Sequence, residues 1–379
     1  MKGLSRIDES PAARWWWSVD HTSLGLLGAL MTFGVVLLFA AGPGAAARFH
    51  IDDSFHFPSR QILFLAPALA VIVAASALTP LQARRAGAVL FAIMFAALIA
   101  ALLFAPEING AKRWFAFGPF SFQPSEFLKP GFAVVIAWML AEGARNPRFP
   151  GAAIACGIFV VCAGLLAMQP DYGQAGLLTM VFMAMYFVSG GGLLLLTLAA
   201  AAAAGLFTAG YFFSPHLAAR IDAFLNPGTG ESYQTAKALE AIANGGLIGR
   251  ADSAAPVKFS LPDAHTDFIF AVAAEEYGVI VCAIIITLLA ALVVRAYVKA
   301  VALKSIFAQT AVCGLAALIG LQSLINIGVN LRALPAKGMT LPFISYGGSS
   351  LIAAGLTVGL MLALTRRQSL ADKRKDVMP

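Results

Sequence analysis

The sequence predicts an all-α integral membrane protein with about ten transmembrane helices. Two properties of the composition indicate this: 60% of the 379 residues are hydrophobic and only 12% are charged, about half the charged fraction of a typical soluble domain. The third observation is that apolar runs of about twenty residues, the length that crosses a bilayer, recur along most of the chain.

These runs divide the chain into one membrane domain and two polar tails. Residues 1–21 form the first tail, and its Arg14 followed by three tryptophans is typical of an anchor in the lipid headgroup layer. Residues 22–366 form a single polytopic domain, and residues 367–379 form the second tail. The spans are expected at 22–41, 60–79, 86–105, 125–142, 152–168, 173–189, 191–213, 267–294, 306–331 and 343–365.

The distribution of Lys and Arg predicts the orientation of these spans. Loops on the side of the two termini carry more basic residues for their length than loops on the other side, which indicates that both termini are cytoplasmic. The longer loops are then outside, at 42–59, 106–124, 214–266 and 332–342. The four cysteines all fall inside apolar runs and are expected to be small apolar filler.

The loop 214–266, between the seventh and eighth spans, is too long for a simple connector. Within it, residues 231–247 carry apolar side chains at the spacing of one helical face, namely Ala236, Leu239, Ala243 and Leu247. This pattern predicts an amphipathic helix that lies on the outer membrane surface.

The stretch 261–278 joins a polar turn to the start of a membrane helix. The helix is expected to run unbroken from 268 to about 294, so that Asp267 stands at its outer end, near His265. A carboxylate in this position is costly unless it is solvated, paired or functional. An aspartate can also cap a helix, and the two roles can coexist.

Helix geometry leaves Asp267 as a lone candidate base. Glu275 is expected roughly 12 Å further along the helix axis, which fits poorly with the carboxylate spacing of glycosidases. Glu275 and Glu276 are therefore interpreted as structural acids. His265 and Asp267 could also contribute to a divalent cation site, for Mg or Mn, completed by a substrate phosphate, but two ligands at this spacing are a weak signal.

Other outer loops also gather polar residues. Lys112 and Arg113 beside Trp114 suit a phosphate or pyrophosphate, or an anchor among lipid headgroups. Ser345 opens a run of hydroxyl and glycine residues that permits close helix packing or binds an anion through exposed amides. No motif indicates a nucleotide, zinc or nucleic-acid site.

Three further positions complete this set. Glu126 and Lys129 are three residues apart and can pair on one helix face. Residues 169–174 have the composition of an ordinary turn, and Lys337 lies in a Gly/Pro-rich turn on the outer side, where basic residues are unusual.

Together these stretches resemble the SEDS family of bacterial membrane glycosyltransferases, the FtsW/RodA/SpoVE group. The motifs that carry the resemblance are GAKRW (110–114), QPSE (123–126), QPDYG (169–173), YQ (233–234), GGLIG (245–249), LPDAHTDFIFAVAAEE (261–276) and LPFISYGGSS (341–350). They occur in order over nearly the whole chain. The Lys337-Gly338 pair is more similar to the division branch, FtsW, than to the elongation branch, RodA. Between 250 and 259 the chain has fewer glycines than the family pattern.

The resemblance implies a fold and an activity. It implies ten membrane helices with a large extracytoplasmic loop between helices 7 and 8, and polymerisation of lipid II into glycan strands at the outer face of the bacterial inner membrane, at the division septum. Asp267 would deprotonate the acceptor hydroxyl, and undecaprenyl pyrophosphate would leave. The implied substrate-binding residues are Lys112, Arg113, Trp114, Gln123, Ser125, Asp171, Gln174, Lys258, His265, Lys337 and Ser345.

The implied partners are lipid II, a class B penicillin-binding protein transpeptidase, other divisome membrane proteins and membrane lipid, with no nucleic acid. Three alternatives stay open: a lipid II flippase, a RodA-type elongation polymerase, and a scaffold without catalysis. A transporter should carry ionisable groups near the bilayer midplane on several helices, whereas nearly all charges here lie at the ends of spans. That distribution favours chemistry at the membrane surface over transport.

Overall fold

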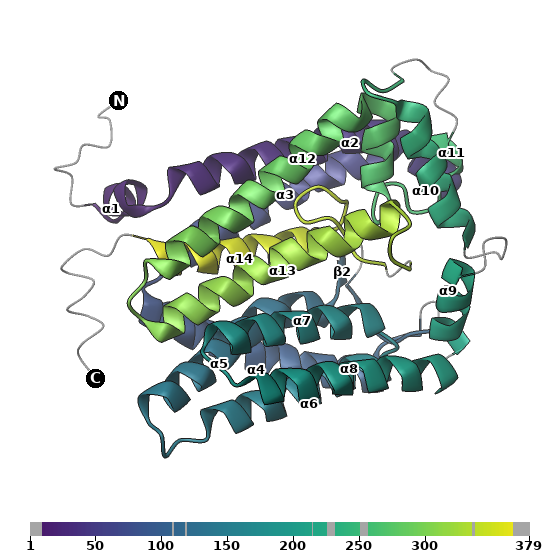
Figure 1. Cartoon of the computed structure of the whole chain (residues 1–379). Helices are drawn as coiled ribbons and strands as arrows, with labels where there is room; N and C mark the ends of the chain where they lie inside the picture. Colours follow the sequence, from purple (N-terminus) through teal and green to yellow (C-terminus); the bar gives the residue numbers. More distant parts are fainter. Residues whose placement is uncertain are drawn as a thin grey trace.

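The computed structural model describes residues 10–107, 110–117, 120–213, 215–225, 232–250, 257–335 and 338–366. Within this part of the chain, nine helices are long and apolar enough to cross a membrane, and a tenth, α7, is apolar but shorter. These ten helices run side by side in one bundle (Figure 1). The predicted fold class is therefore confirmed.

The bundle helices are α2 (His21–Arg48), α3 (His56–Ser76), α4 (Pro80–Phe104), α5 (Pro124–Arg145), α6 (Gly151–Met168), α7 (Tyr172–Val188), α8 (Leu193–Phe213), α12 (Ile269–Val301), α13 (Ile306–Asn330) and α14 (Gly348–Thr365). The smaller elements are α1 (Pro11–Ser18), α9 (Pro215–Leu225), α10 (Ser232–Gly245), α11 (Val257–Ser260) and an antiparallel ribbon of β1 (Phe115–Phe117) and β2 (Phe120–Phe122).

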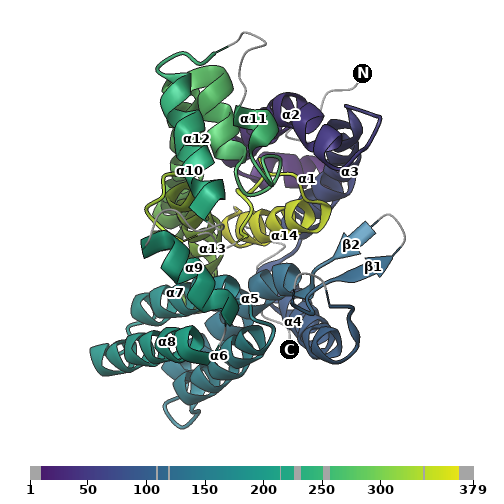
Figure 2. The same ribbon diagram turned by 90° about the vertical axis from the view of Figure 1, so that its right-hand side faces the viewer.

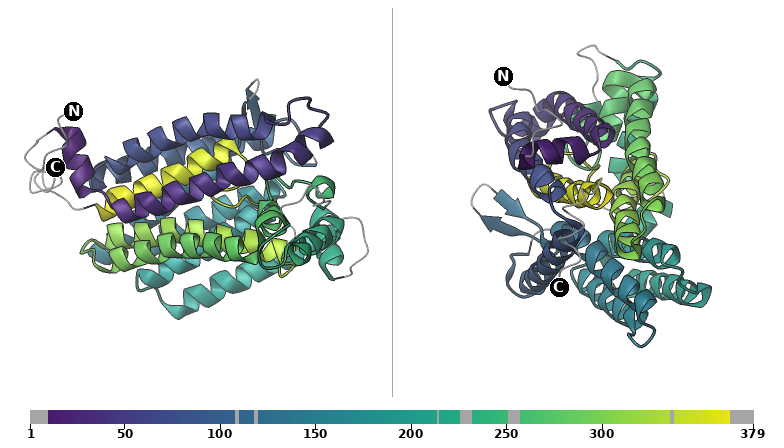
Figure 3. Two further views of the ribbon diagram at one scale, coloured as in Figure 1. Left: turned by 90° about the horizontal axis from the view of Figure 1, so that it is seen from above. Right: turned by 90° about the vertical axis from the view of Figure 1, so that its left-hand side faces the viewer.

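The bundle has two distinct ends. Helix α1 and the last turn of α14 lie at one of them, the tail end, whereas α9, α10 and α11 lie at the other, the loop end (Figures 1 and 3). Both ends of the described chain thus lie at the same end of the bundle, as an even number of spans predicts. Figure 2 looks onto the loop end and shows the β1–β2 ribbon standing at the side of the bundle, an element that the sequence did not predict.

Local sequence explains several helix boundaries. Thr79 and Gln82 form a capping box at the start of α4. Pro80, between them, occupies the first helical position, where a missing backbone N–H costs nothing. Pro124 opens α5 in the same way. The hydroxyl of Ser305 accepts a hydrogen bond from the first turn of α13.

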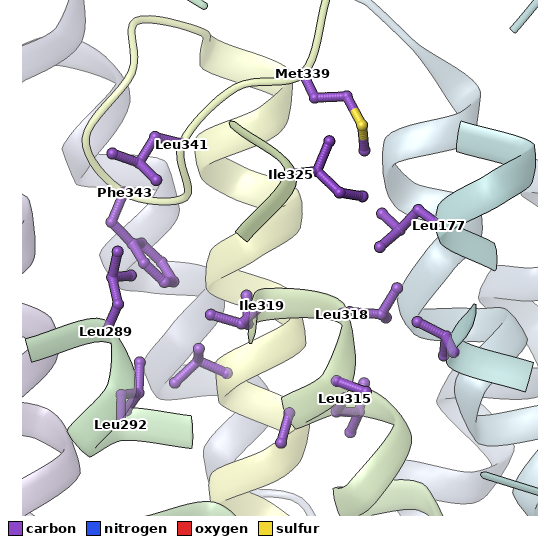
Figure 4. Packing of buried hydrophobic residues seen from close by; sticks show 14 of the residues in the cluster. Leu177, Leu289, Leu292, Leu315, Leu318, Ile319, Ile325, Met339, Leu341 and Phe343 are labelled. Atoms are coloured by element: carbon purple, nitrogen blue, oxygen red, sulfur yellow. The ribbon is translucent and has the colours of Figure 1, made fainter. Parts of the chain in front are cut away.

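Helices α5, α13 and α14 form the centre of the bundle. In their most apolar windows 61%, 72% and 67% of residues are buried, against 17% for α4 and 6% for α8, which therefore present most of their apolar side chains outward, toward lipid. Figure 4 shows the central packing of Leu315, Leu318, Ile319 and Ile325 of α13 with Leu177 of α7, Leu289 and Leu292 of α12, and Met339, Leu341 and Phe343 of the segment before α14.

The helix that follows Asp267 is broken, and the prediction of an unbroken helix was wrong. Within α12, Gly278 has a φ of 80° and a ψ of 176°, which are not helical. A Cβ at Gly278 would lie only 2.3 Å from the carbonyl oxygen of Leu247, so the main chain of another segment occupies the space beside it. Apolar periodicity could not reveal this break, because the apolar pattern continues through it.

The segment 246–250 fills the break. The amide of Val279 donates to the carbonyl of Gly246 at 3.0 Å, and the amide of Arg250 donates to the carbonyl of Glu275 at 2.8 Å. Backbone groups that lose their helical partners at the kink are thus satisfied by the loop. The loop that follows α10 is therefore hydrogen-bonded to α12 on both sides of the break.

Helix α10 confirms the prediction of a helix over 231–247, but its protein-facing side differs from the predicted apolar face. It packs against α12 through small residues, including Thr235, Ala238 and Ala241. Close approach explains this choice, since a Cβ at Gly245 would lie 1.8 Å from the carbonyl oxygen of Ala274. The side chains of Ala236, Leu239, Ala243 and Leu247 are exposed.

The last span also begins later than predicted, at residue 348 rather than 343. Phe343 has a φ of 67°, a left-handed conformation that a helix does not contain. Residues 338–347 consequently form an irregular segment, which folds back over the ends of α12 and α13.

Candidate active site

Asp267 lies at the loop end, in the turn directly before α12. The capping position of α12 is occupied by Phe268 and no side chain caps the helix there, so the carboxylate does not act as the cap. Asp267 makes no side-chain hydrogen bond within the part of the chain that the structure describes. Its Oδ2 lies beside Gly338, where a Cβ would be 3.6 Å away. Asp267 is half-buried, and its carboxylate lies next to a residue without a side chain.

The surroundings of Asp267 make its carboxyl group a stronger base than usual. Its pKa is raised to about 7, first by burial and then by the negative charge of Asp263, against an opposing effect of Arg220 on α9. A general base is most effective when its pKa lies near the working pH. The site therefore holds a carboxyl group that can both accept and release a proton at neutral pH.

His265 is buried among aromatic rings. Its ring centroid lies 4.3 Å from that of Phe57, 5.6 Å from that of Tyr346 and 6.0 Å from that of Phe49. Burial lowers the pKa of the imidazole to about 4, so the ring is neutral at neutral pH. Its Nδ1 is buried and finds no hydrogen-bond partner among the described residues.

A second polar cluster lies where α5 and α7 begin. Arg113 donates from Nε to the carbonyl of Gln169 at 2.9 Å and from Nη2 to the carbonyl of Pro170, and its Nη1 is 3.9 Å from Asp171 Oδ1. Gln123 Nε2 is 3.5 Å from the other oxygen of Asp171. Burial raises the pKa of the Asp171 carboxyl, although the charge of Arg113 opposes this effect. The structure therefore brings together three of the predicted binding residues.

A buried ion pair lies one turn further along α5. Lys129 Nζ donates to Glu126 Oε1 at 2.9 Å and to Gln322 Oε1 at 2.8 Å, and Gln174 Nε2 donates to the same oxygen of Glu126 at 2.8 Å. The predicted pairing of Glu126 with Lys129 is confirmed. Ser125 Oγ and Gln174 Oε1 are buried without a hydrogen-bond partner in the described part of the chain, as expected where water or a polar ligand binds.

From this ion pair a polar path leads toward the irregular segment before α14. Gln322 Nε2 donates to the carbonyl of Thr340 at 3.0 Å, and the hydroxyls of Thr340 and Ser350 are 2.6 Å apart. A narrow crevice opens among α5, α13 and α14, and its polar lining consists of Glu126, Lys129, Gln322, Ser350 and Thr357. The crevice is too narrow for a sugar, but it carries polar groups into the apolar bundle.

The residues that sequence reasoning missed lie on α13. Gln322, Asn326 and Asn330 are spaced four residues apart, all are buried, and all donate to main-chain carbonyls of the irregular segments. Three amides at helical spacing in an otherwise apolar span were the available signal, because a buried amide requires partners.

The other predicted residues have different settings. Ser345 donates to the carbonyl of Thr266 at 2.5 Å and accepts from the amide of Leu341 at 2.8 Å, so its hydroxyl links two turns of the site. Glu275 is fully buried and accepts from the amide of Val257 at 3.2 Å, which agrees with its interpretation as a structural acid.

Four predicted binding residues remain, namely the cations Lys112, Lys258 and Lys337 and the aromatic Trp114. Lys112 and Trp114 are half-buried in the segment before β1. Lys258 lies in α11, but its side chain is outside the described part, and Lys337 lies outside the described residues altogether. No group of three or more His, Cys, Asp or Glu that could hold a metal ion occurs in the described ranges.

Comparison with known proteins gives a consistent picture. Residues 21–370 match the family model FTSW_RODA_SPOVE, described as a cell cycle protein. The chain is 43% identical to the "Probable peptidoglycan glycosyltransferase FtsW" of Caulobacter vibrioides over 96% of this chain and 94% of that one. It is 34% identical to the protein of the same name from Thiomicrospira cyclica, over 91% of each chain.

Solved structures extend the similarity to the fold. A chain from a structure described as "Structural coordination of polymerization and crosslinking by a peptidoglycan synthase complex" matches with a TM-score of 0.76 and 29% identity, over 92% of this chain and 98% of that one. The rod shape determining protein RodA of Thermus thermophilus matches with a TM-score of 0.70 and 29% identity, over 93% of this chain and 99% of that one.

Proposed function

The chain belongs to the FtsW/RodA/SpoVE family of cell cycle proteins, and we propose that it is a peptidoglycan glycosyltransferase of the FtsW type that polymerises lipid II. The observation that carries this proposal is the Asp267 carboxylate, which has a pKa near neutrality and no hydrogen bond to the described residues. Relatives named as FtsW glycosyltransferases, similar over nearly their whole length, support the reaction class.

In the proposed reaction, Asp267 is the general base. It takes the proton of the acceptor sugar's 4-hydroxyl group while that oxygen attacks the anomeric carbon of the donor sugar. A new glycosidic bond forms, the bond from the anomeric carbon to undecaprenyl pyrophosphate breaks, and the anomeric configuration is inverted. The proton remains on Asp267 until it is released to solvent, and the pyrophosphate leaves with the electron pair.

Cations must stabilise the negative charge that develops on the leaving pyrophosphate. We assign this role to Lys112, Arg113 and Lys258, with Trp114 bracing the first pair. Arg113 is held in place by the turn that contains Asp171. The remaining substrate contacts are assigned to Gln123, Ser125, Asp171, Gln174, His265, Lys337 and Ser345.

The proposal also has a cellular side. The loop end would face outward from the bacterial inner membrane, where lipid II presents its sugars, and both termini would be cytoplasmic. A class B penicillin-binding protein would crosslink the product, in line with the structurally similar peptidoglycan synthase complex, which is described as coordinating polymerization and crosslinking. Division rather than elongation is proposed because the relatives from Caulobacter vibrioides and Thiomicrospira cyclica are named FtsW.

The test is polymerisation of lipid II by the purified full-length protein together with its transpeptidase partner, with products separated by gel electrophoresis. Asp267→Asn should lower glycan synthesis by about three orders of magnitude or more, as loss of an essential base does. Asp263→Asn is the control: it removes an exposed carboxylate from the same turn, and asparagine tolerates its φ of 52°. Because the charge of Asp263 helps to raise the pKa of Asp267, the variants are compared at pH 8, where Asp267 is ionised with or without that charge, and Asp263→Asn should still polymerise lipid II. Full polymerisation by folded Asp267→Asn would reject the assignment.

The same preparations also test the flippase alternative. In reconstituted vesicles, a polymerase should extend lipid II presented on the outer leaflet without moving it across the bilayer. If the wild-type protein moved lipid II across the bilayer without making polymer, and Asp267→Asn did so equally well, the flippase would be favoured over the polymerase. The acidic and basic side chains that are buried within the described spans, Glu126, Lys129 and Glu275, all lie in the first turns of their helices, at the loop end, which favours surface chemistry.

A further inference from the structure

Two asparagine side chains on α13 lie directly against the Asp267 turn and have no part in the proposed bond-making steps. Asn326 is 1% exposed and Asn330 is 0% exposed. Buried amide groups are costly unless every polar atom finds a partner. The partners of these two amides therefore indicate what they do.

Both amides bind the main chain of Asp267. Asn326 Nδ2 donates to the carbonyl of Asp267 at 2.9 Å and to the carbonyl of Met339 at 2.6 Å. Asn330 Nδ2 donates to the same Asp267 carbonyl at 2.9 Å, and its Oδ1 accepts from the amide of Ala271 at 3.1 Å. Carbonyl oxygens only accept and backbone amides only donate, so these partners fix the orientation of both side chains.

The contacts of Asn330 replace a missing helix cap. The first turn of α12 has no side-chain cap from its own sequence. The amide of Ala271 belongs to that turn and donates both to the carbonyl of Phe268 at 3.0 Å and to Asn330 Oδ1 at 3.1 Å. Asn330 thus gives this donor a second acceptor from a neighbouring helix and simultaneously binds the Asp267 carbonyl. The beginning of α12 is therefore held by α13.

The contacts of Asn326 fix a second distance. This amide joins Asp267 to Met339, and the residue before Met339, Gly338, is the one that lies beside the carboxylate oxygen. The carboxylate and the segment that faces it are thus held by one side chain. Because the restraint acts on the carbonyl, both carboxylate oxygens keep their lone pairs for an acceptor hydroxyl.

We propose that Asn326 and Asn330 are positioning residues, which hold the Asp267 main chain so that its carboxylate is aligned for proton abstraction. The inference rests on the proposed function, since it explains how the base of that reaction is placed. No side-chain hydrogen bond restrains the carboxylate within the described part of the chain, so the two amides on its carbonyl are its closest polar restraint.

The experiment compares Asn326→Ala and Asn330→Ala with Ser323→Ala in the full-length enzyme, with kcat and KM for lipid II measured across a pH series. Ser323 is a matched control, because it is buried on the same helix and donates only to the carbonyl of Ile319 of that helix, at 2.8 Å. Each asparagine variant should lose about 10- to 100-fold in kcat, the usual cost of misplacing a reacting group by an ångström, whereas Ser323→Ala should match the wild type.

Two further readouts distinguish positioning from general stability. KM should stay within about twofold, because the substrate still binds. The acid limb of kcat should move to lower pH, since a loosened turn admits water and lowers the pKa of Asp267 toward that of a solvated carboxyl. The charged groups that act on this carboxyl, Asp263 on its own turn and Arg220 on α9, are unchanged in these variants.

Folded variants with wild-type kcat and an unmoved acid limb would overturn the proposal, even if their thermal stability fell. If Asn326→Ala does not fold, Asn326→Ser, which keeps one donor, is measured instead. Its kcat should lie between those of the wild type and Asn330→Ala. Wild-type kinetics of Asn326→Ser would overturn the proposal. Asp267→Asn in the same assay separates this inference from the proposed function. If Asp267→Asn is active, the proposed function fails, because Asp267 is then not the base. If Asp267→Asn is inactive but Asn326→Ala and Asn330→Ala have wild-type kinetics, only the positioning proposal fails.

Discussion

Two aspartates of this protein stand directly before long helices, at opposite ends of the bundle, and they are held in opposite ways. At the tail end, Asp20 precedes α2 and accepts hydrogen bonds from Arg295 at 2.6 and 2.7 Å and from Ser23 at 2.7 Å, with Lys299 3.0 Å away. At the loop end, Asp267 precedes α12 and has no side-chain hydrogen bond to any described residue.

The difference appears in their proton affinities. Burial by itself would raise the pKa of Asp20, but the hydrogen bonds from Arg295, Ser23 and Lys299 outweigh it and hold the pKa well below its ordinary range. The pKa of Asp267 is raised to about 7. A carboxylate with both oxygens hydrogen-bonded links α2 to α12 and is inert, whereas one without a hydrogen bond to a described residue, in a half-buried turn, is available for proton transfer. The same residue type before the same kind of element thus has opposite roles, set by distant contacts.

The largest effect on stability is expected at the ion pair of Glu126 and Lys129 at the loop end. Its removal tests whether paired charges at this end only stabilise the fold, as those of Asp20 do, or also contribute to the reaction. Lys129→Met leaves Glu126 buried without its cation, which should lower the free energy of unfolding by about 3–5 kcal/mol. Thermal unfolding in detergent measures this loss.

The control is the double variant Glu126→Gln with Lys129→Met, which removes both charges. It should recover most of the stability, yet remain poorly active if the pair contributes to substrate binding. A stable and fully active double variant would show that this pair, like Asp20 with its partners, only supports the fold.

The pH dependence of the reaction compares the two aspartates directly. Because a base must be ionised, the rate should fall toward tenfold for each pH unit below the pKa of Asp267 of about 7, or about 50-fold between pH 7 and pH 5. The fold should persist over this range. The folded-state pKa of Asp20 is lowered, so its stabilisation is complete above the ordinary carboxyl pKa of about 3.9 and is lost only as the pH falls through the lowered value. A rate profile that is flat from pH 5 to pH 8 would contradict the role of Asp267.

Removal of the Asp20 carboxylate should have a moderate effect of a different kind. Asp20→Asn loses the ionic part of its contacts with Arg295 and Lys299, whose side chains are 37% and 30% exposed, so solvent screening limits the cost to about 1–2 kcal/mol of unfolding free energy. Activity per folded molecule should be unchanged. Ser23→Ala, which removes a neutral donor to the same carboxylate, should cost less. A loss of kcat in folded Asp20→Asn would mean that the tail end controls the reaction.

The sequence predicted the spans and the Asp267 turn because both depend on local features. A run of about twenty apolar residues is a span in any context, and a polar motif at the end of one is unusual wherever it occurs. The break at Gly278 was missed because its cause lies in residues 246–250, which replace its helical partners. The ion pair of Asp20 with Arg295 was missed for the same reason, since Arg295 is 275 positions away in the chain. Asn326 and Asn330 were missed because their partners are main-chain atoms, which no side-chain motif records.

The smallest expected effect gives the sharpest contrast between the two aspartates, because the sign of the change in stability should be opposite. The folded-state pKa of Asp267 is raised, so between the ordinary carboxyl pKa of about 3.9 and about 7 the folded protein binds more protons than the unfolded chain, and stability falls as the pH rises through this window. Asp267→Asn removes this penalty and should raise the unfolding midpoint by on the order of 1–3 °C at pH 8. The gain should vanish near pH 4, where the wild-type carboxyl is protonated when folded.

Thermal unfolding of both asparagine variants at pH 8 measures the contrast: Asp20→Asn should unfold at a lower temperature than the wild type and Asp267→Asn at a higher one. A shift in the same direction for both would mean that Asp267 has a partner as stabilising as those of Asp20, and that its carboxylate is structural.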